Sequence, residues 1–369
     1  MNSKIFSVTA FMLMSTFAAC DGPDSVATSD PEATPQTVAL LTNLKTLAAR
    51  GTMIGHQDAL AYGEGWYDEA GRCDFRDACG HYPALFGWEV GELEQGAAYS
   101  LDSVYFDRIR DYMKQVYAWG GVNTLSWHSR NPFTGGDAWD VSSSEVVASI
   151  LPGGAKNALY EEWLDRLADF FLSLKDDNGT LIPVIFRPFH ELTGSWFWWG
   201  RDLCSVDQYV ALWRYTADGL RARGVHNLLW AYSAAGYASV EEFAERYPGD
   251  GYVDIVGFDA YDQPNSGFSD DVRARTAILL EFAAAHDKLP AFTETGSEGL
   301  KDPEWFENTL YPLLQGQGLS YVMLWRNAYN IPGHFYAAWP GYAPAAQNMR
   351  QFVEREDVLT LDEIGLLYE

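Results

Sequence analysis

Short apolar runs alternate with amphipathic stretches of helical length along most of the chain, and this alternation restricts the possible folds more than any other feature. Eight apolar runs bounded by turn residues are expected to form strands: Thr52–Gly55, Ala84–Trp88, Val122–Trp127, Ile182–Arg187, Asn227–Ala231, Asp254–Phe258, Ala291–Thr293 and Tyr321–Trp325. The helices expected between and after them include Ser103–Trp119, Tyr160–Leu174, Val206–Arg223, Asp271–His286, Pro303–Leu314 and, near the end, Ala345–Phe352. This order predicts the α/β class and, within it, a single-domain (β/α)8 TIM barrel.

The first 36 residues have a different character from the rest. A basic start at Lys4 and an apolar run over 5–19 predict an export signal, because the run is too short for a comfortable transmembrane span. Small residues precede Cys20, which predicts a bacterial lipoprotein with Cys20 lipidated and held at the cell envelope; simple secretion is the alternative. Residues 20–36 are rich in Pro, Ser, Thr and Asp and are expected to form a flexible tether. The folded domain should then span residues 37–369.

Cysteine spacing suggests one crosslink in the exported chain. Cys73 and Cys79 bracket a short polar segment, so a disulfide between them is expected, with Cys204 left as a free thiol. Neither a CxxC pair nor histidines at ligand spacing accompany these cysteines. We therefore expect no metal site.

The charge balance narrows the choice of partners. The chain has 51 acidic and 25 basic residues, a net charge of −26, which repels nucleic acids and anionic membrane surfaces. A neutral ligand suffers no such repulsion, and 14 Trp with 21 Tyr provide flat faces that can stack on sugar rings. We expect a carbohydrate partner, a protein that acts as a monomer, and membrane contact only through the N-terminal lipid.

Two connections, 55–83 and 129–157, are much longer than ordinary loops and both follow predicted strands. In a barrel, the carboxyl ends of the strands carry the active site. These long loops are therefore expected to form the walls of a cleft.

The residues that end the predicted strands are rich in groups that bind or cleave sugars. They are His56-Gln57, Trp88-Glu89, Trp127-His128, Arg187 to Glu191, Tyr232, Asp259 to Tyr261, Glu294 and Trp325-Arg326. Glu191 and Glu294 close the fourth and seventh strands, which brings them to the same barrel mouth. Cleavage of a glycosidic bond needs such a pair, one carboxyl group as proton donor and one as nucleophile or base. A separation of about 5–5.5 Å would mean retention of configuration.

Several motifs at these positions resemble glycoside hydrolase family 26, the β-mannanase family. They are Phe186-Arg187-Pro188-Phe189-His190-Glu191, Trp196-Phe197-Trp198-Trp199-Gly200, Phe258-Asp259-Ala260-Tyr261, Phe292-Thr293-Glu294 and Leu324-Trp325-Arg326-Asn327-Ala328. The resemblance extends from about Thr37 to Phe352 and is loose outside the motifs. It implies a retaining mannan endo-1,4-β-mannosidase that needs no cofactor, with Glu191 as acid/base and Glu294 as nucleophile.

The resemblance also implies roles for the neighbours of this pair. Trp196 would lie beside the scissile bond, Tyr261 against the nucleophile and Trp325 beneath the reacting sugar. The implied ligands of the next sugar on the non-reducing side are His128, Asp259 and Arg326. His190, which precedes the acid/base, replaces an Asn found in many relatives of the clan. Next to Pro188, Arg187 is expected to be a buried positioning residue.

The first hypothesis is thus an enzyme of polysaccharide degradation that hydrolyses mannan, glucomannan or galactomannan by double displacement, either endo-acting or releasing mannobiose. A β-1,3/1,4-glucanase or β-1,4-xylanase on the same scaffold is the alternative enzyme. A surface lipoprotein that binds glycans without cleaving them is the alternative of a different class, although it would not need both carboxylates.

Overall fold

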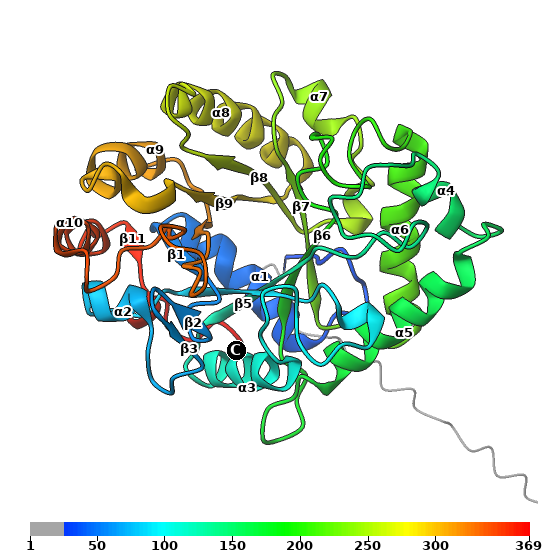
Figure 1. The fold of residues 1–369 in the computed structure, drawn as a ribbon, viewed down its shortest axis with the longest axis horizontal. Helices are drawn as coiled ribbons and strands as arrows, with labels where there is room; N and C mark the ends of the chain where they lie inside the picture. The colour runs from blue at the N-terminus through cyan, green and yellow to red at the C-terminus, as the bar shows by residue number, and fades with distance from the viewer. Residues whose placement is uncertain (1–25) are drawn as a thin grey trace, which may run out of the picture.

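The computed structural model describes residues 26–369, which form a closed barrel of parallel strands surrounded by helices (Figure 1). The barrel strands are β1 (Thr52–Gln57), β4 (Leu85–Glu89), β5 (Val122–Trp127), β6 (Val184–Pro188), β7 (Leu228–Ala234), β8 (Ile255–Tyr261), β9 (Leu289–Gly296) and β10 (Tyr321–Leu324). They pair in chain order, and β10 also pairs with β1, which closes the sheet. The predicted eight-stranded (β/α)8 barrel is confirmed.

The helices lie outside the barrel, as a right-handed βα repeat requires. They are α1 (Pro35–Ala48), α2 (Asp74–Cys79), α3 (Phe106–Ala118), α4 (Val146–Ile150), α5 (Asn157–Ser173), α6 (Val206–Ala222), α7 (Val240–Ala244), α8 (Phe268–His286), α9 (Tyr311–Leu314) and α10 (Ala343–Val353). The helix expected over 303–314 is a π-helical turn, Phe306–Leu310, that continues into α9. Within residues 26–369, no helix is both long and apolar enough to span a bilayer.

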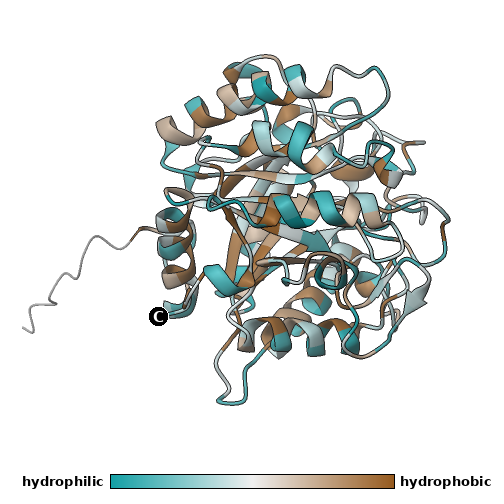
Figure 2. Cartoon of the chain, turned by 90° about the vertical axis from the view of Figure 1, so that its left-hand side faces the viewer, coloured by the Kyte–Doolittle hydropathy of each residue, from teal (hydrophilic) through white to brown (hydrophobic). Residues whose placement is uncertain are grey.

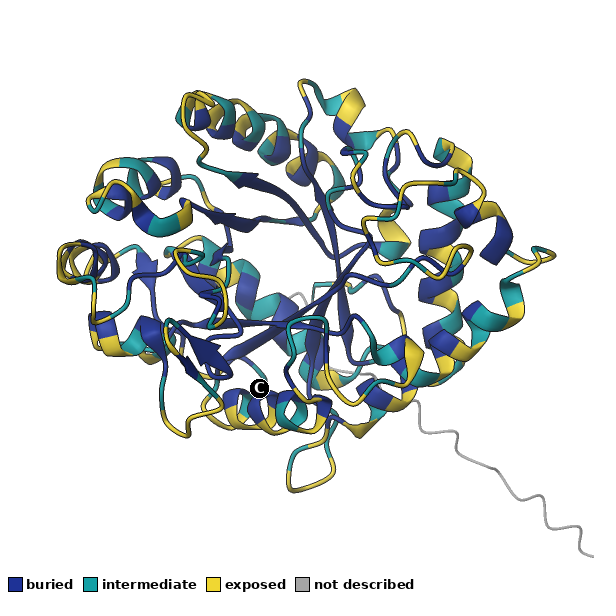
Figure 3. Ribbon diagram, viewed as in Figure 1, coloured by how far each residue is buried: buried dark blue, intermediate teal, exposed yellow. Residues whose placement is uncertain are grey.

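Side chains alternate between two apolar cores along each strand. In β6, for example, Ile185 lies in the core inside the barrel, whereas Val184 and Phe186 pack outward in the larger core beneath the helices. The strands are buried throughout and the outer faces of the helices are exposed (Figure 3). Figure 2 shows the corresponding contrast between apolar strands and mixed helices. This alternation determines which strand residues can reach the barrel mouth.

The amino-terminal end of the barrel is covered by α1. Its residues Leu40, Leu41, Leu44 and Leu47 are buried in the inner core. Thr34 caps this helix, since its side chain accepts a hydrogen bond from the backbone N–H of Thr37. The open end of the barrel is therefore the opposite one, at the carboxyl ends of the strands, where the long loops lie.

The folded region begins earlier than the expected boundary at residue 37. The Ser29 backbone N–H donates to Asp254 at 2.6 Å, and Asp30 pairs with His226 at 2.9 Å. Asp254 and His226 each lie just before a barrel strand, β8 and β7 respectively. Residues 29–36 therefore pack against the amino-terminal end of the barrel instead of forming a tether. The polar composition of residues 29–36 did not predict this packing, because the contacts that hold the segment are themselves polar. The export signal (1–19) and Cys20 lie outside the described residues.

Both long loops contain secondary structure. The first holds the hairpin of β2 (Tyr62–Gly63) and β3 (Trp66–Tyr67) and helix α2; the second holds α4. A further short strand, β11 (Val358–Leu359), pairs with the start of β1. The two long loops are therefore structured segments instead of irregular connections.

The predicted disulfide is wrong. Cys73 and Cys79 are free and buried, and they lie at opposite ends of α2, with Cys73 capping it and Cys79 closing it. Six residues of helix span about 9 Å, which exceeds the Cα separation that a disulfide tolerates. The Cys79 thiol instead donates to the carbonyl oxygen of His81. The sequence spacing was compatible with a small loop, but the segment forms a helix that separates the two thiols.

Candidate active site

The inner face of the barrel becomes polar at the carboxyl ends of the strands. Arg187 lies two residues after Ile185, which points into the barrel, and Asp259 lies four residues after Ile255, which also points inward. Both are buried, and Arg187 Nη1 donates to Asp259 Oδ2 at 2.7 Å. Side chains on a strand alternate with a period of two, so the positions after the inner-core residues also point inward. They place an ion pair in the layer above the inner core. The expected role of Arg187 as a buried positioning residue agrees with this contact.

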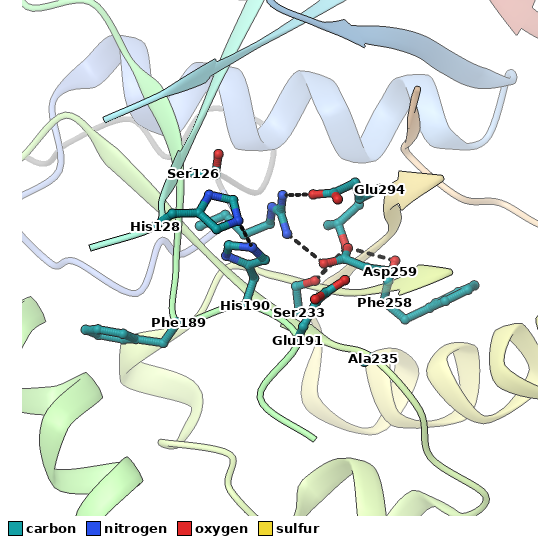
Figure 4. A network of polar contacts seen from close by, with 12 residues as sticks. Ser126, His128, Phe189, His190, Glu191, Ser233, Ala235, Phe258, Asp259 and Glu294 are labelled. Carbon is teal, nitrogen blue, oxygen red and sulfur yellow. Dashed lines mark hydrogen bonds and ion pairs between the residues drawn. The ribbon is translucent and has the colours of Figure 1, made fainter. Parts of the chain in front are cut away.

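Glu294 reaches the same ion pair because β9 contains a bulge. The register between β8 and β9 shifts after Phe258, so that Asp259 pairs with Glu294 and Thr293 is the extra residue. Arg187 Nη2 donates to Glu294 Oε2 at 2.5 Å. One buried guanidinium thus binds two carboxylates from neighbouring strands (Figure 4).

Tyr261 provides the second donor to Glu294, through its hydroxyl group to Oε1. The Glu294 side chain remains 6% exposed. Its two oxygens are therefore held in place by Arg187 and Tyr261 at the floor of the barrel mouth, where the carboxylate can act as a nucleophile.

Asp259 differs from its expected role. Its side chain has no exposed surface, and Oδ1 accepts hydrogen bonds from Ser233 and Thr293 while Oδ2 binds Arg187. Since the side chain has no exposed surface, a sugar hydroxyl cannot reach either oxygen. The expectation of direct sugar contact is replaced by a positioning role for Arg187.

Glu191 lies in an irregular turn directly after β6. Phe189 and Glu191 both have positive φ, 50° and 54°, a conformation that costs energy for residues other than glycine. Hydrogen bonds hold the turn: Tyr209 donates to the carbonyl of Phe189 at 2.9 Å, and Trp199 to that of His190 at 2.8 Å. The turn directs the Glu191 carboxyl group toward the barrel mouth (Figure 4).

The surroundings of Glu191 favour its protonated form. Burial, followed by the negative charges of Asp259 and Glu294, raises the pKa of Glu191 to about 8. Trp196 Nε1 donates to Glu191 Oε2 at 2.5 Å, which opposes this shift. Glu191 and Glu294 are therefore chemically identical groups in different surroundings, and Glu191 is the one that can donate a proton near neutral pH.

Two histidines lie beside this pair. His128 Nδ1 contacts Glu89 Oε2 at 2.7 Å, and its Nε2 lies 3.0 Å from Nε2 of His190. Burial lowers the pKa of His128, but the Glu89 carboxylate outweighs it and raises that pKa above its usual value. Burial and then the charges of Arg187 and His128 lower the pKa of His190 well below the usual range. His128 therefore binds a proton more readily than His190 does.

A second ion pair borders the mouth on the side of β10 and β1. Arg326 Nε lies 3.2 Å from Asp102, which belongs to the loop before α3. Asp58 lies nearby with positive φ and accepts a hydrogen bond from Tyr62 at 2.6 Å. Trp325, the residue before Arg326, is partly exposed beside the inner core. The predicted Trp325 and Arg326 thus lie at the mouth, and Arg326 has an acidic partner that the sequence did not indicate.

Trp139 is a site residue that the sequence reasoning missed. Its ring stacks on His128, with centroids 5.3 Å apart and planes inclined by 15°, and the side chain is 46% exposed. Asn131 fixes its loop by donating to the carbonyl of Asp140 and accepting from the N–H groups of Phe133 and Thr134. Trp139 is an isolated tryptophan in a Gly-rich loop, outside any strand or helix pattern, so no sequence signal assigned it to the site. Only the fold places it over His128.

The arrangement supplies the two functions that glycosidic cleavage requires, a proton donor and a carboxylate nucleophile. Two exposed aromatic rings lie at the mouth: Trp139 stacks on His128, and Trp196 donates to Glu191. Among residues 26–369, no group of three or more His, Cys, Asp or Glu side chains is placed to hold a metal ion.

Arg187→Met is expected to lower the free energy of unfolding at pH 7 by about 3–5 kcal/mol, because it leaves Asp259 and Glu294 buried without their cation. Urea unfolding measures this change. The loss should be smaller at acid pH, because burial raises the pKa of Asp259 and its protonated carboxyl group no longer needs the guanidinium. Arg273→Met, at an exposed position of α8, is the matched control and should change stability by about 0.5 kcal/mol or less. Equal stability of Arg187→Met and the parent at pH 7 would contradict the prediction.

Comparisons with known proteins agree with this geometry. Residues 29–309 match the family described as Glycosyl hydrolase family 26. A β-mannanase of that family from Bacteroides ovatus superposes with a TM-score of 0.89 at 47% identity, covering 91% of this chain and 98% of that one. The catalytic domain of an endo-β-1,4-mannanase from Bacillus sp. JAMB-750 has a TM-score of 0.85 at 30% identity, covering 93% and 96%.

A mannan endo-1,4-β-mannosidase from Bifidobacterium adolescentis is 33% identical over 343 residues, which is 86% of this chain but only 34% of that protein. The chain spans about a third of that curated relative and 52–60% of those from Bacillus subtilis. The family match covers the barrel strands from β1 to β9 and both candidate carboxyl groups. The chain belongs to glycosyl hydrolase family 26.

Proposed function

We propose that this chain is an endo-β-1,4-mannanase that hydrolyses mannan, glucomannan or galactomannan with retention of configuration. The observation that carries the proposal is the different surroundings of two carboxyl groups at one barrel mouth. Glu191 has a pKa raised to about 8, whereas both oxygens of Glu294 accept hydrogen bonds, one from Arg187 and one from Tyr261. Similarity to mannanases over nine tenths of the chain supports the substrate.

In the proposed first step, Glu294 attacks the anomeric carbon while Glu191 donates its proton to the glycosidic oxygen, so the bond breaks and a glycosyl-enzyme forms. In the second step Glu191, now ionised, takes a proton from water, and the resulting nucleophile releases the sugar from Glu294. Loss of the Glu191 proton in the first step makes it a base for the second. Trp196 holds its carboxyl group in position throughout.

We propose that the remaining mouth residues bind the sugars on the non-reducing side. Trp325 offers an apolar face beneath the reacting sugar, and Trp139 offers another above His128. His190 and Arg326 provide polar groups for hydroxyls. Each is already oriented by a protein partner, which lowers the entropy cost of binding.

A substrate panel tests the proposal. Residues 26–369 are incubated with linear mannan, mixed-linkage glucan and xylan, and the released sugars are resolved over time. A ladder of manno-oligosaccharides is expected from mannan and no products from the other two. Early mannobiose alone would point to a cleft closed at one end. Release of sugars only from glucan or xylan would reject the mannanase and favour the alternative enzymes.

The pH profile should report Glu191 directly. The acid works only when protonated, so kcat/KM should fall as pH rises through about 8. The Trp196 hydrogen bond lowers this pKa. Trp196→Phe should therefore move the alkaline limb to higher pH, while Trp119→Phe, at a partly exposed tryptophan after α3, should leave it in place. An alkaline limb that is the same in all three proteins would argue against Glu191 as the acid.

We also propose that the protein is exported and lipidated at Cys20. The proposal is supported by the apolar run over 5–19, the small residues before Cys20 and the polar stretch after it. Mass spectrometry of the protein made in a bacterial host should find residue 20 as an acylated N-terminus. Cys20→Ala should abolish acylation and membrane association. An unmodified mature protein that starts elsewhere would indicate simple secretion.

A further inference from the structure

A pocket adjoins Glu191 on the side of the mouth formed by the loops after β7 and β8. Its volume is about 560 Å³, and its lining includes Glu191, Trp196, Gly236, Gln263, Asp271 and Arg275. In the eight-stranded ring, β7 and β8 lie opposite β1 and β4. Asp58 directly follows β1, and Glu89, which contacts His128, is the last residue of β4. The pocket therefore lies across the mouth from Asp58 and Glu89, and these two neighbour residues of the non-reducing side: Arg326 lies near Asp58, and His128, on which Trp139 stacks, contacts Glu89.

Arg275 is held rigidly in the wall of this pocket. On α8, its Nε and Nη2 bind the two oxygens of Asp271, at 3.0 and 2.5 Å. Its Nη1 donates to the carbonyl oxygen of Ala235 at 2.7 Å. A guanidinium has five N–H groups, so two remain without a partner among the described residues. The side chain is 17% exposed, which leaves these two donors available at the pocket.

Gly236 leaves this guanidinium uncovered. A Cβ atom at position 236 would lie 3.6 Å from Nη2 and 3.9 Å from Cζ of Arg275, with no other neighbour within 4 Å. The space directly above the guanidinium is therefore open because residue 236 has no side chain. A larger residue would cover Arg275 without a backbone clash.

We propose that the Asp271–Arg275 pair binds two adjacent hydroxyl groups of a sugar in the leaving group, the part of the chain released when Glu191 protonates the glycosidic oxygen. The inference rests on the proposed function. A neutral diol offers two neighbouring oxygen acceptors to the free N–H groups, and Asp271, whose side chain is 43% exposed, can accept a hydrogen bond that a sugar hydroxyl donates. Trp196, next to Glu191, would separate this sugar from the bond that breaks.

Two substrates separate this role from a structural one. Mannohexaose places sugars on both sides of the scissile bond, whereas 2,4-dinitrophenyl β-mannobioside has no sugar in its leaving group. Arg275→Met should lower kcat/KM for mannohexaose by about tenfold to a hundredfold, since hydrogen bonds to a charged group are lost. Hydrolysis of the aryl mannobioside should not change. Gly236→Leu should give the same pattern with the ion pair intact.

Arg273→Met is the matched control, because Arg273 lies on the same helix but is exposed and donates only to the carbonyl of Pro312. It should behave as the parent on both substrates. Equal losses on both substrates in Arg275→Met and Gly236→Leu would show a structural effect and overturn the inference, as would no loss on either. A parent protein inactive on both would reject the proposed function itself, and the inference with it.

Discussion

Glu294→Ala should lower kcat for mannan hydrolysis by about four orders of magnitude or more, because the glycosyl-enzyme can no longer form. Folding should survive, since Arg187 keeps its ion pair with Asp259 at 2.7 Å. Steady-state hydrolysis of mannan measures the loss, and urea unfolding checks stability. Glu298→Ala is the matched control, because that exposed glutamate lies just beyond β9 and, among residues 26–369, pairs with His334 alone. It should hydrolyse mannan like the parent.

Azide makes this prediction specific to a nucleophile. In Glu294→Ala, a small anion can occupy the space of the lost carboxylate and attack the anomeric carbon of an activated aryl mannoside. One displacement inverts the configuration, so the product should be the α-mannosyl azide. Unchanged mannan hydrolysis in Glu294→Ala would reject the assignment. A β-configured azide would mean that another group forms the covalent intermediate.

The strand period predicted much of the site, because the residues that end the apolar runs are also those that reach the barrel mouth. Arg187 and Asp259 follow directly from alternation along β6 and β8. Glu294 does not, since it depends on a bulge in β9. The sequence placed it at a strand end, but only the register of β9 against β8 brings it beside Asp259.

Contacts between distant segments account for the predictions that differed. Asp259 looked like a sugar ligand until its three donors, Arg187, Ser233 and Thr293, were brought together by three other strands. Trp139 and Asp102 gained meaning only when their loops packed beside His128 and Arg326. The spacing of residues in the sequence relates neighbours along the chain, whereas these contacts join separate strands and loops that only the fold brings together.

Glu191→Ala should affect substrates according to how much their leaving group needs a proton. For mannan, whose leaving group is a poor one, kcat/KM should fall by about 10²–10⁴-fold. For 2,4-dinitrophenyl β-mannobioside the first step needs no acid, so a rapid burst of dinitrophenol should remain. Turnover after the burst should be slow, because water has lost its base and the glycosyl-enzyme accumulates. Stopped-flow absorbance separates the two phases.

Azide distinguishes this variant from Glu294→Ala. In Glu191→Ala the nucleophile is still present, so azide needs no base and should speed the second step to give the β-mannosyl azide, with net retention after two displacements. The limb of the pH profile near 8 should also disappear, because the group responsible for it is gone. Opposite azide configurations from the two variants can arise only if Glu294 attacks and Glu191 transfers protons. Equal losses on mannan and on the aryl substrate would contradict a proton-transfer role for Glu191.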